Sequence, residues 1–157
     1  MAAHDAGLHE GGLPRSRTGV IEGFYGPPWA PDRRIEVLRW CAERGMGAYV
    51  WAPKDDPKHR DAWRDLYDAD ELAVLAQLVD GSDLRVGWAV GPGLSMDAKS
   101  GDDHAALHRK VDQVLGLGVD LVVLALDDLP VRPGQGPEHA DIARRLHDHL
   151  HGRAELW

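Results

Sequence analysis

Two neighbouring aspartates, Asp127 and Asp128, stand at the end of an apolar run in the segment DLVVLALDDLP. The residues from 121 to 127 have the composition of a strand that is buried on both faces of a parallel sheet. Removing water from a carboxylate costs free energy, so a pair at the end of such a strand is either solvated by a loop or held in a site that uses it. The pair is therefore the first candidate for chemistry in this chain.

Adjacent carboxylates favour one kind of acid–base chemistry. Two like charges at close range do not both ionise freely, so the pKa of one carboxyl group is expected to rise and leave an acid near neutral pH. A retaining glycosidase with an enzyme nucleophile needs carboxyl groups about 5 Å apart on different sides of the scissile bond, whereas neighbouring residues start ~3.8 Å apart at Cα and approach from one side. Adjacent aspartates suit substrate-assisted hydrolysis better, in which the sugar's acetamido group is the nucleophile.

Metal binding is the alternative chemistry, because paired aspartates also hold Mg²⁺ in phosphoryl-transfer sites. That interpretation would prefer a phosphate-binding loop, but GPGLS at 91–95 lacks the GK[ST] ending of a P-loop. The other two Asp-Asp pairs have simpler explanations. N-capping of a helix explains Asp102 and Asp103, while a salt-bridged loop and a site are equally good explanations for Asp55 and Asp56 in KDDPKHRDAWR.

Further candidates lie near the ends of other predicted strands. Lys54 follows an apolar strand, and it could donate hydrogen bonds to sugar hydroxyls or pair with Asp55 or Asp56. Gly23 lies within a strand pattern, which suggests that another group approaches the backbone closely there. The rings that follow it could form an apolar wall for a sugar face; they are Phe24, Tyr25 and Trp29.

Histidines near the C-terminus raise a weaker metal hypothesis. His147 and His151 lie one helical turn apart in HDHLH and share a face, but no third ligand in register accompanies them. A solvated polar helix face explains them better than a zinc site. Two tryptophans, Trp40 in a predicted helix and Trp88 in a predicted strand, are expected in the core.

Length and composition narrow the class of protein. The 157 residues are enough for one core but fewer than the roughly 250 of a closed eight-unit α/β barrel. The formal charge of −8 argues against a nucleic acid partner. Cys41 is the single cysteine, and no apolar segment predicts a secretion signal or a membrane span, so we expect a soluble cytoplasmic protein with no membrane partner. Residues 1–17 are predicted to form a disordered tail.

Strand-like and helix-like segments alternate after this tail. Strands are predicted at 19–25, 48–53, 84–90 and 121–127, and helices at 32–44, 70–79, 103–115 and 137–151, with AELW at 154–157 resembling the start of a fifth strand. Such alternation predicts one α/β domain over 18–157, with a parallel sheet and right-handed crossovers. Parallel sheets place working residues just past the carboxyl ends of their strands, where the candidates above fall.

Four segments in series resemble glycoside hydrolase family 84, the β-N-acetylglucosaminidases that include O-GlcNAcase. They are GVIEGFYGPPW, AYVWAPKDDPKHRDAWRDLY, GPGLS and VDQVLGLGVDLVVLALDDLP, and they cover almost all of residues 19–130. The resemblance implies the N-terminal half of a TIM (β/α)8 barrel, with four parallel βα units, and retaining hydrolysis of β-linked N-acetylglucosamine through an oxazoline intermediate. It also implies that Asp128 is the general acid/base and that Asp127 orients the acetamido group.

Substrate contacts follow from the same resemblance. The backbone of Gly23 and the side chains of Lys54 and Asp127 would bind the sugar, and Tyr25 is a further candidate through its ring. The expected partner is a glycan or glycoprotein that contains N-acetylglucosamine. No metal and no organic cofactor is implied.

The length of the chain departs from the family pattern, because family members continue through the second half of the barrel. A half barrel would expose strand edges and apolar faces that allow self-association. Three origins are compatible with it: a piece of a longer enzyme, which we favour, a half that pairs with a second chain or copy, or a non-catalytic remnant. We expect little or no turnover from this chain by itself. The alternative function is a non-catalytic carbohydrate-binding or assembly module built on a half barrel.

Overall fold

A computed structural model describes residues 18–157, so the predicted tail at 1–17 lies outside the described residues. The elements in chain order are β1 (Gly19–Glu22), α1 (Pro31–Glu43), β2 (Ala48–Trp51), α2 (Ala69–Asp80), β3 (Arg85–Val90), the short 3₁₀ helix η1 (Pro92–Leu94), α3 (Gly101–Leu115), β4 (Leu121–Leu124), α4 (Gln135–Leu150) and β5 (Glu155–Leu156). The strands form one sheet in the order β1-β2-β3-β4-β5, and every neighbouring pair is parallel. The predicted parallel α/β architecture and the start of a fifth strand are confirmed. None of the described helices is long and apolar enough to cross a bilayer.

Three strands end earlier than the sequence predicts. β1 ends at Glu22, β2 at Trp51 and β4 at Leu124. The apolar composition continues beyond these ends, although ladder pairing of the strands stops there. Gly23 therefore follows a strand and does not lie inside one, and Asp127 is three residues past the end of β4. The extra residues form the loops that carry the candidate site.

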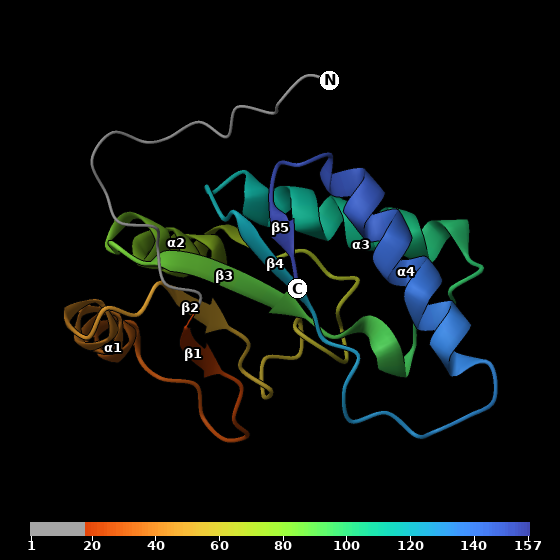
Figure 1. Ribbon diagram of the computed structural model, residues 1–157, viewed down its shortest axis with the longest axis horizontal. Helices are drawn as coiled ribbons and strands as arrows, with labels where there is room; N and C mark the ends of the chain where they lie inside the picture. The colour runs from red at the N-terminus through yellow and green to blue at the C-terminus, as the bar shows by residue number, and fades with distance from the viewer. Residues whose placement is uncertain (1–17) are drawn as a thin grey trace, which may run out of the picture.

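The helices pack against one face of the sheet, with α1 beside α2 and α3 beside α4 (Figure 1). Large buried side chains from the sheet and the helices fill this layer, and Cys41 of α1 is fully buried in it. Trp88 on β3 belongs to this core, as predicted. The prediction for Trp40 is wrong, because Leu38 and Cys41 face inward and Trp40 lies on the outer side of α1 with 47% of its surface exposed. The guanidinium of Arg44 lies 4.1 Å from the centre of the Trp40 ring.

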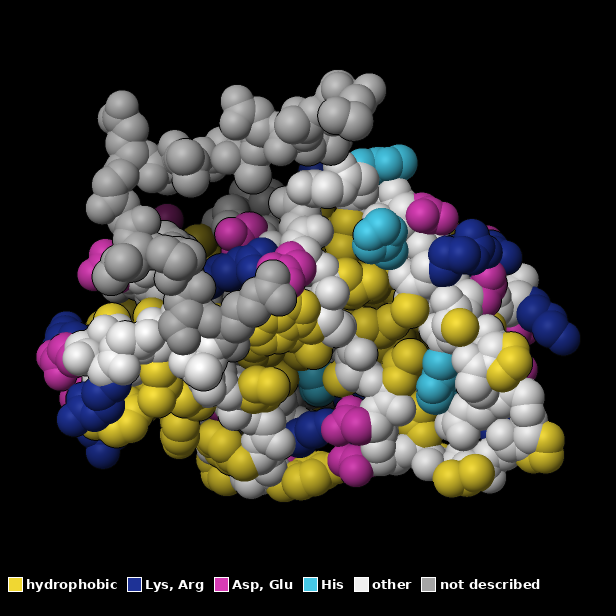
Figure 2. All heavy atoms as spheres, viewed as in Figure 1, with side chains coloured by type: hydrophobic (Ala, Val, Ile, Leu, Met, Phe, Trp, Pro, Cys, Tyr) yellow, Lys and Arg dark blue, Asp and Glu magenta, His cyan; other side chains and the backbone are white. Residues whose placement is uncertain are grey.

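The other face of the sheet is lined by smaller side chains. They form a second buried cluster of Ala48, Val50, Ala52, Ala89 and Leu121, with Val123 packed against it. Ile21 on the edge strand β1 is 58% exposed at the border of this face. In Figure 2 acidic side chains gather beside a basic one on the side of the molecule toward which the β3 arrow of Figure 1 points.

The start of α3 corrects one prediction. Ser100 is the N-cap residue, and its hydroxyl accepts a hydrogen bond from the backbone N–H of Asp103, whereas Asp102 and Asp103 lie in the first turn. Asp103 instead pairs with Arg64, whose Nε and Nη2 lie 2.8 and 2.7 Å from the two carboxylate oxygens. This hydrogen-bonded pair lowers the pKa of Asp103. The second aspartate therefore fastens the loop after β2 to α3.

Candidate active site

The loops after β2 and β4 bring Lys54 against the aspartate pair. Lys54 Nζ donates a hydrogen bond of 2.7 Å to Asp127 Oδ2 and lies 3.9 Å from Asp128 Oδ2. The lysine side chain is only 10% exposed, whereas more than half of each carboxylate side chain is open to solvent. Lys54 thus pairs across the sheet edge and not with Asp55 or Asp56, and it fixes one side of an accessible polar site.

The Lys54 ammonium also sets the charge of Asp127. Its hydrogen bond holds the pKa of the Asp127 carboxyl below the ordinary value of an aspartate. The sequence predicts that repulsion between the two carboxylates raises the pKa of one of them. For Asp127 the shift is in the opposite direction, because a close cation outweighs the neighbouring carboxylate, so this side chain is ionised at neutral pH.

Asp128 has different partners. The Tyr25 hydroxyl donates to Asp128 Oδ2 at 3.3 Å, and Arg60 Nη2 donates to the Asp128 backbone carbonyl at 3.0 Å. Arg60 Nη1 donates to the Tyr25 hydroxyl at 3.2 Å and lies 3.8 Å from Asp128 Oδ2. Asp128 has a φ of 54°, in the left-handed region that non-glycine residues seldom adopt. Three strand-end loops therefore meet at this one aspartate.

Arg60 was not identified from the sequence. It lies in KDDPKHRDAWR, where alternating charges suggest a solvated loop. The segment after β2 consists mainly of turns up to residue 65, and nothing in the local pattern shows which charge the turns direct inward. Its proximity to Asp128 depends on a contact between residues 68 positions apart.

The three rings after β1 do not form one wall. Phe24 and Trp29 pack on each other with ring centroids 5.1 Å apart, and the backbone N–H of Trp29 donates to the Glu22 carboxylate. Tyr25 lies apart from them, 66% exposed, with its hydroxyl at Asp128. Space beside Gly23 is largely open, since a Cβ there would meet only a methyl group of Ile21, at 3.3 Å.

The loop after β2, which carries Lys54 and Arg60, is tied down on both sides. Asp55 accepts a hydrogen bond of 2.9 Å from the N–H of Gly26, and Asp56 accepts one of 2.9 Å from the hydroxyl of Tyr67. These bonds replace the salt-bridged loop considered for the two aspartates, and within residues 18–157 no ion pair reaches either carboxylate. Neighbouring loops are thereby joined through the KDD segment.

His59 fastens the same loop to β3. Its Nδ1 lies 2.9 Å from the carbonyl oxygen of Ala89, and its own carbonyl accepts a hydrogen bond of 2.8 Å from the N–H of Gly91. The ring is 1% exposed, and this burial lowers its pKa, which favours the neutral imidazole that donates from Nδ1. His59 therefore fixes the position, relative to β3, of the loop that carries Lys54 and Arg60.

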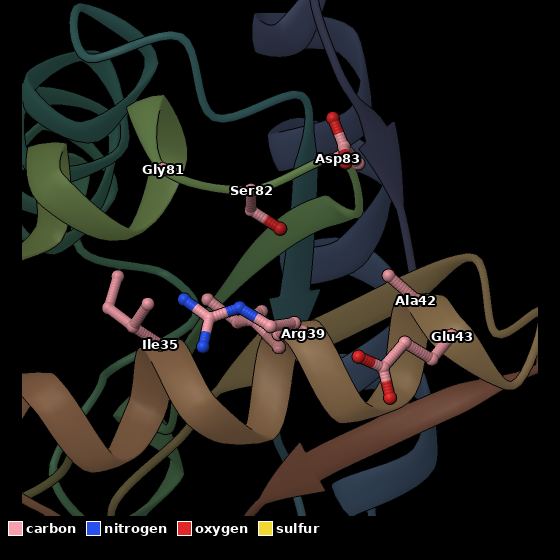
Figure 3. A pocket seen from close by; sticks show the side chains of 8 residues that line it. Ile35, Arg39, Ala42, Glu43, Gly81, Ser82 and Asp83 are labelled. Atoms are coloured by element: carbon pink, nitrogen blue, oxygen red, sulfur yellow. The ribbon is translucent and has the colours of Figure 1, made fainter.

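A hollow of about 560 Å³ opens beside the charged cluster, and it is lined by Tyr25, Lys54, Asp55, Pro57, Arg60, Asp61 and Leu94. A second hollow lies between α1 and the segment that connects α2 to β3 (Figure 3). Ser82 and Asp83 at its rim precede β3, so it lies away from the carboxyl ends of the strands. The first hollow is lined by three side chains that contact the aspartate pair, those of Tyr25, Lys54 and Arg60.

Among residues 18–157, no group of three or more His, Cys, Asp or Glu side chains is arranged to hold a metal ion. His147 is largely exposed and lies beside Asp148 at 3.8 Å. The other histidine of the predicted pair, His151, follows the last residue of α4 as its C-cap.

A parallel α/β sheet with an aspartate pair at the carboxyl end of a strand is an arrangement that glycosidases of the TIM-barrel class use. The family model described as beta-N-acetylglucosaminidase matches residues 18–155. The chain belongs to this family, glycoside hydrolase family 84.

Similar proteins carry the same family identity. The chain is 36% identical over 122 residues to Protein O-GlcNAcase of Rattus norvegicus and of Mus musculus, with 76% of this chain and 13% of each relative covered. A solved structure of an O-GlcNAc hydrolase mutant from Thermobaculum terrenum superposes with a TM-score of 0.76 at 27% identity, over 89% of this chain and 33% of that one. The solved structure of CpGH84B superposes with a TM-score of 0.80 at 31% identity, over 87% of this chain and 26% of that one. The chain thus spans about one eighth of the curated relatives and up to a third of the solved structures.

Proposed function

We propose that the protein serves in the removal of β-linked N-acetylglucosamine by retaining, substrate-assisted hydrolysis. The observation that carries the proposal is the contact of Lys54 with Asp127 at 2.7 Å, directly beside Asp128. This arrangement places a carboxylate whose pKa is lowered by Lys54 next to a second carboxylate with different partners. Substrate-assisted hydrolysis needs such a division, because one group must orient the acetamido nitrogen while the other transfers a proton.

The surroundings of each residue support separate roles in this proposal. Ionised Asp127 accepts a hydrogen bond from the acetamido N–H and stabilises the positive charge that develops as the acetamido oxygen attacks the anomeric carbon. Asp128 gives its proton to the glycosidic oxygen as the bond breaks, and then takes a proton from the water that opens the oxazoline. Lys54 and the open backbone at Gly23 bind sugar hydroxyls, and the exposed ring of Tyr25 borders the sugar. The substrate is a glycan or glycoprotein that bears N-acetylglucosamine, as the names of the relatives suggest.

A chromogenic β-N-acetylglucosaminide tests this proposal. The protein should be assayed in the longest form that its gene expresses, with Asp128→Asn and Asp127→Asn beside it. We expect each variant to lose about 10²-fold or more in kcat, because each removes a group that acts in the transition state. Full activity of Asp128→Asn, or no hydrolysis by the unaltered protein, would contradict the proposal.

The 157-residue chain by itself should turn over little substrate, because the described part of the site is open to solvent on the side of the aspartates. Sugar binding should be measured in parallel by calorimetry. Saturable binding of N-acetylglucosamine without hydrolysis in every form of the protein would favour the alternative, a carbohydrate-binding module.

A further inference from the structure

Among residues 18–157, Arg60 is the one charged side chain that contacts both the backbone of Asp128 and a partner of its carboxylate. Nη2 holds the carbonyl oxygen at 3.0 Å, and Nη1 donates to the Tyr25 hydroxyl, which in turn donates to Asp128 Oδ2. A planar guanidinium can make both contacts at once because its donors are fixed in a fork. The arginine side chain is 14% exposed, so its position is well defined by packing.

The backbone of Asp128 needs such support. A non-glycine residue in the left-handed region persists only where surrounding contacts compensate for the strain. The conformation turns the Asp128 carbonyl toward Arg60 while the carboxylate lies toward Tyr25, and β4 has already ended at Leu124, so sheet pairing does not hold Asp128 in place. Among the described residues, Arg60 and Tyr25 donate the hydrogen bonds that can hold it, and Lys54 lies 3.9 Å from its carboxylate.

We propose that Arg60 is a positioning residue for the proton-transferring carboxylate of Asp128, which it holds at the glycosidic oxygen through the Asp128 carbonyl and the Tyr25 hydroxyl. The inference rests on the proposed function and adds a residue to it that acts through another. A general acid works only from a defined place, since a shift of about 1 Å can cost about 10²-fold in rate. Arg60 therefore matters most where the leaving group needs the proton.

Leaving-group dependence separates this role from a general loss of structure. In Arg60→Gln we expect kcat/KM to fall about 10²-fold for a β-N-acetylglucosaminide of an alkyl alcohol, which leaves only when protonated. For the 2,4-dinitrophenyl glycoside, whose leaving group departs as an anion, the fall should be less than about fivefold. Arg60→Lys keeps the positive charge but loses the forked pair of N–H donors. Its kcat/KM for the alkyl glycoside should lie between the values of the unaltered protein and of Arg60→Gln.

Arg64→Gln is the matched control. Arg64 lies in the same loop and also pairs with an aspartate, but its partner is Asp103, at 2.7 Å, and not the aspartate pair. It should change the rates for both substrates by the same small factor. Equal losses for the two substrates in Arg60→Gln, or no loss in either, would overturn the proposal.

An NMR measurement tests the positioning role of Arg60 without relying on enzymatic activity. The Cα and Cβ chemical shifts of Asp128 report its left-handed conformation, and we expect them to leave that range in Arg60→Gln but not in Arg64→Gln. Unchanged Asp128 shifts in Arg60→Gln would overturn the positioning role even in a protein that hydrolyses nothing. An unaltered protein without hydrolysis would contradict the proposed function alone.

Discussion

Asp127 and Asp128 are neighbours in the chain, yet their side chains have different partners. Asp127 faces a lysine ammonium, and Asp128 faces a tyrosine hydroxyl and an arginine that also binds its backbone. The difference arises from the left-handed turn at Asp128, which directs two consecutive side chains to two strand-end loops. Repulsion between like charges alone would not assign separate roles to the pair.

Replacement of Lys54 by Met should raise the pKa of Asp127. The Lys54 hydrogen bond is the main cause of the lowered value, so its loss returns the carboxyl toward the ordinary aspartate pKa. A ¹³C NMR titration of the Asp127 carboxyl carbon measures the change.

Lys99→Met is the control, because Lys99 is exposed at the end of the segment before α3 and makes no contact with Asp127. It should leave the Asp127 titration unchanged. The same titration midpoint in Lys54→Met and in the unaltered protein would show that the ion pair does not form in solution.

The site residues that could be predicted from the sequence share one property. Lys54, Asp127 and Asp128 directly follow apolar runs, and parallel strands bring their carboxyl ends to one edge. Arg60 and His59 come later in a long loop, so their positions depend on turns and on contacts with distant segments. The sequence pattern therefore predicts the position of a side chain at the end of a strand, but not that of a side chain within a long loop.

At the scale of elements, a buried ion pair fastens α1 to β1. Arg34 Nε and Nη2 lie 2.7 and 2.9 Å from the oxygens of Glu22, and the Tyr49 hydroxyl donates to the same carboxylate. Glu22 is the last residue of β1, and its carboxylate also accepts a hydrogen bond from the backbone N–H of Trp29. It therefore anchors both ends of the loop that carries Tyr25.

Glu22→Gln should destabilise the protein by about 3 kcal/mol, because it leaves the buried Arg34 charge without its counterion. Urea unfolding followed by tryptophan fluorescence measures the free energy of unfolding. Glu36→Gln removes the partner of Arg33 in an exposed pair on the same helix and should cost less than about 0.5 kcal/mol. Similar losses in the two variants would contradict the assigned role of burial.

A stack of histidines joins α3 to α4. The rings of His108 and His149 stack nearly parallel, with an angle of 6° between their planes and centroids 3.9 Å apart, and the ring centroid of His104 lies 6.3 Å from that of His108. Within the described residues, His108 Nε2 is buried and has no hydrogen-bond partner. Burial is the largest cause that lowers the His108 pKa, to about 4, and nearby His149, His104 and Arg145 add to it, whereas Asp112 opposes it.

Acidification should therefore weaken the packing of α3 on α4. The unfolded chain protonates His108 near its ordinary pKa, but the folded chain does so only near 4, so stability is complete above about pH 6.5 and is lost as the pH falls toward 4. Between about pH 7.5 and about pH 5, we expect His108 to account for a loss of about 2 kcal/mol in the free energy of unfolding.

Urea unfolding of His108→Gln at the same two values of pH provides the comparison. Glutamine does not titrate, so this part of the pH dependence should disappear while the rest remains. An unchanged difference between the two pH values in His108→Gln would show that another group causes the loss.

For the molecule as a whole, small residues on the sheet face opposite the helices let side chains of neighbouring strands pack closely. A Cβ at Gly87 would lie 2.9 Å from Leu121 Cδ2 and 3.1 Å from Val50 Cγ2, on the two strands that flank β3. Gly87 thus keeps the space in which the side chains of β2 and β4 meet across β3.

Gly87→Ala should destabilise the protein by about 1 to 3 kcal/mol through overpacking. Gly136→Ala in the first turn of α4 meets nothing within 4 Å and should be neutral or slightly stabilising. Thermal unfolding of the two variants makes the comparison, and a loss as large for Gly136→Ala as for Gly87→Ala would contradict this account.

The architecture was more predictable than its boundaries. Alternating strand-like and helix-like segments predict the parallel sheet, because strands buried on both faces read as continuous apolar runs. The ends of β1, β2 and β4 were predicted too late because apolar loop residues such as Ala125 and Leu126 look like strand when read alone. Trp40 was misplaced because tryptophan gives no indication of which helix face it occupies when the apolar stripe is narrow.

Cys41 gives this fold a built-in reporter. It is the single cysteine of the chain, it is fully buried where α1 meets the core, and burial raises the pKa of its thiol. A thiol reagent can react with it only when α1 opens, so the alkylation rate measures how often that helix leaves the sheet. Followed across urea concentrations, the rate would reveal whether α1 detaches in a local event or only when the entire domain unfolds.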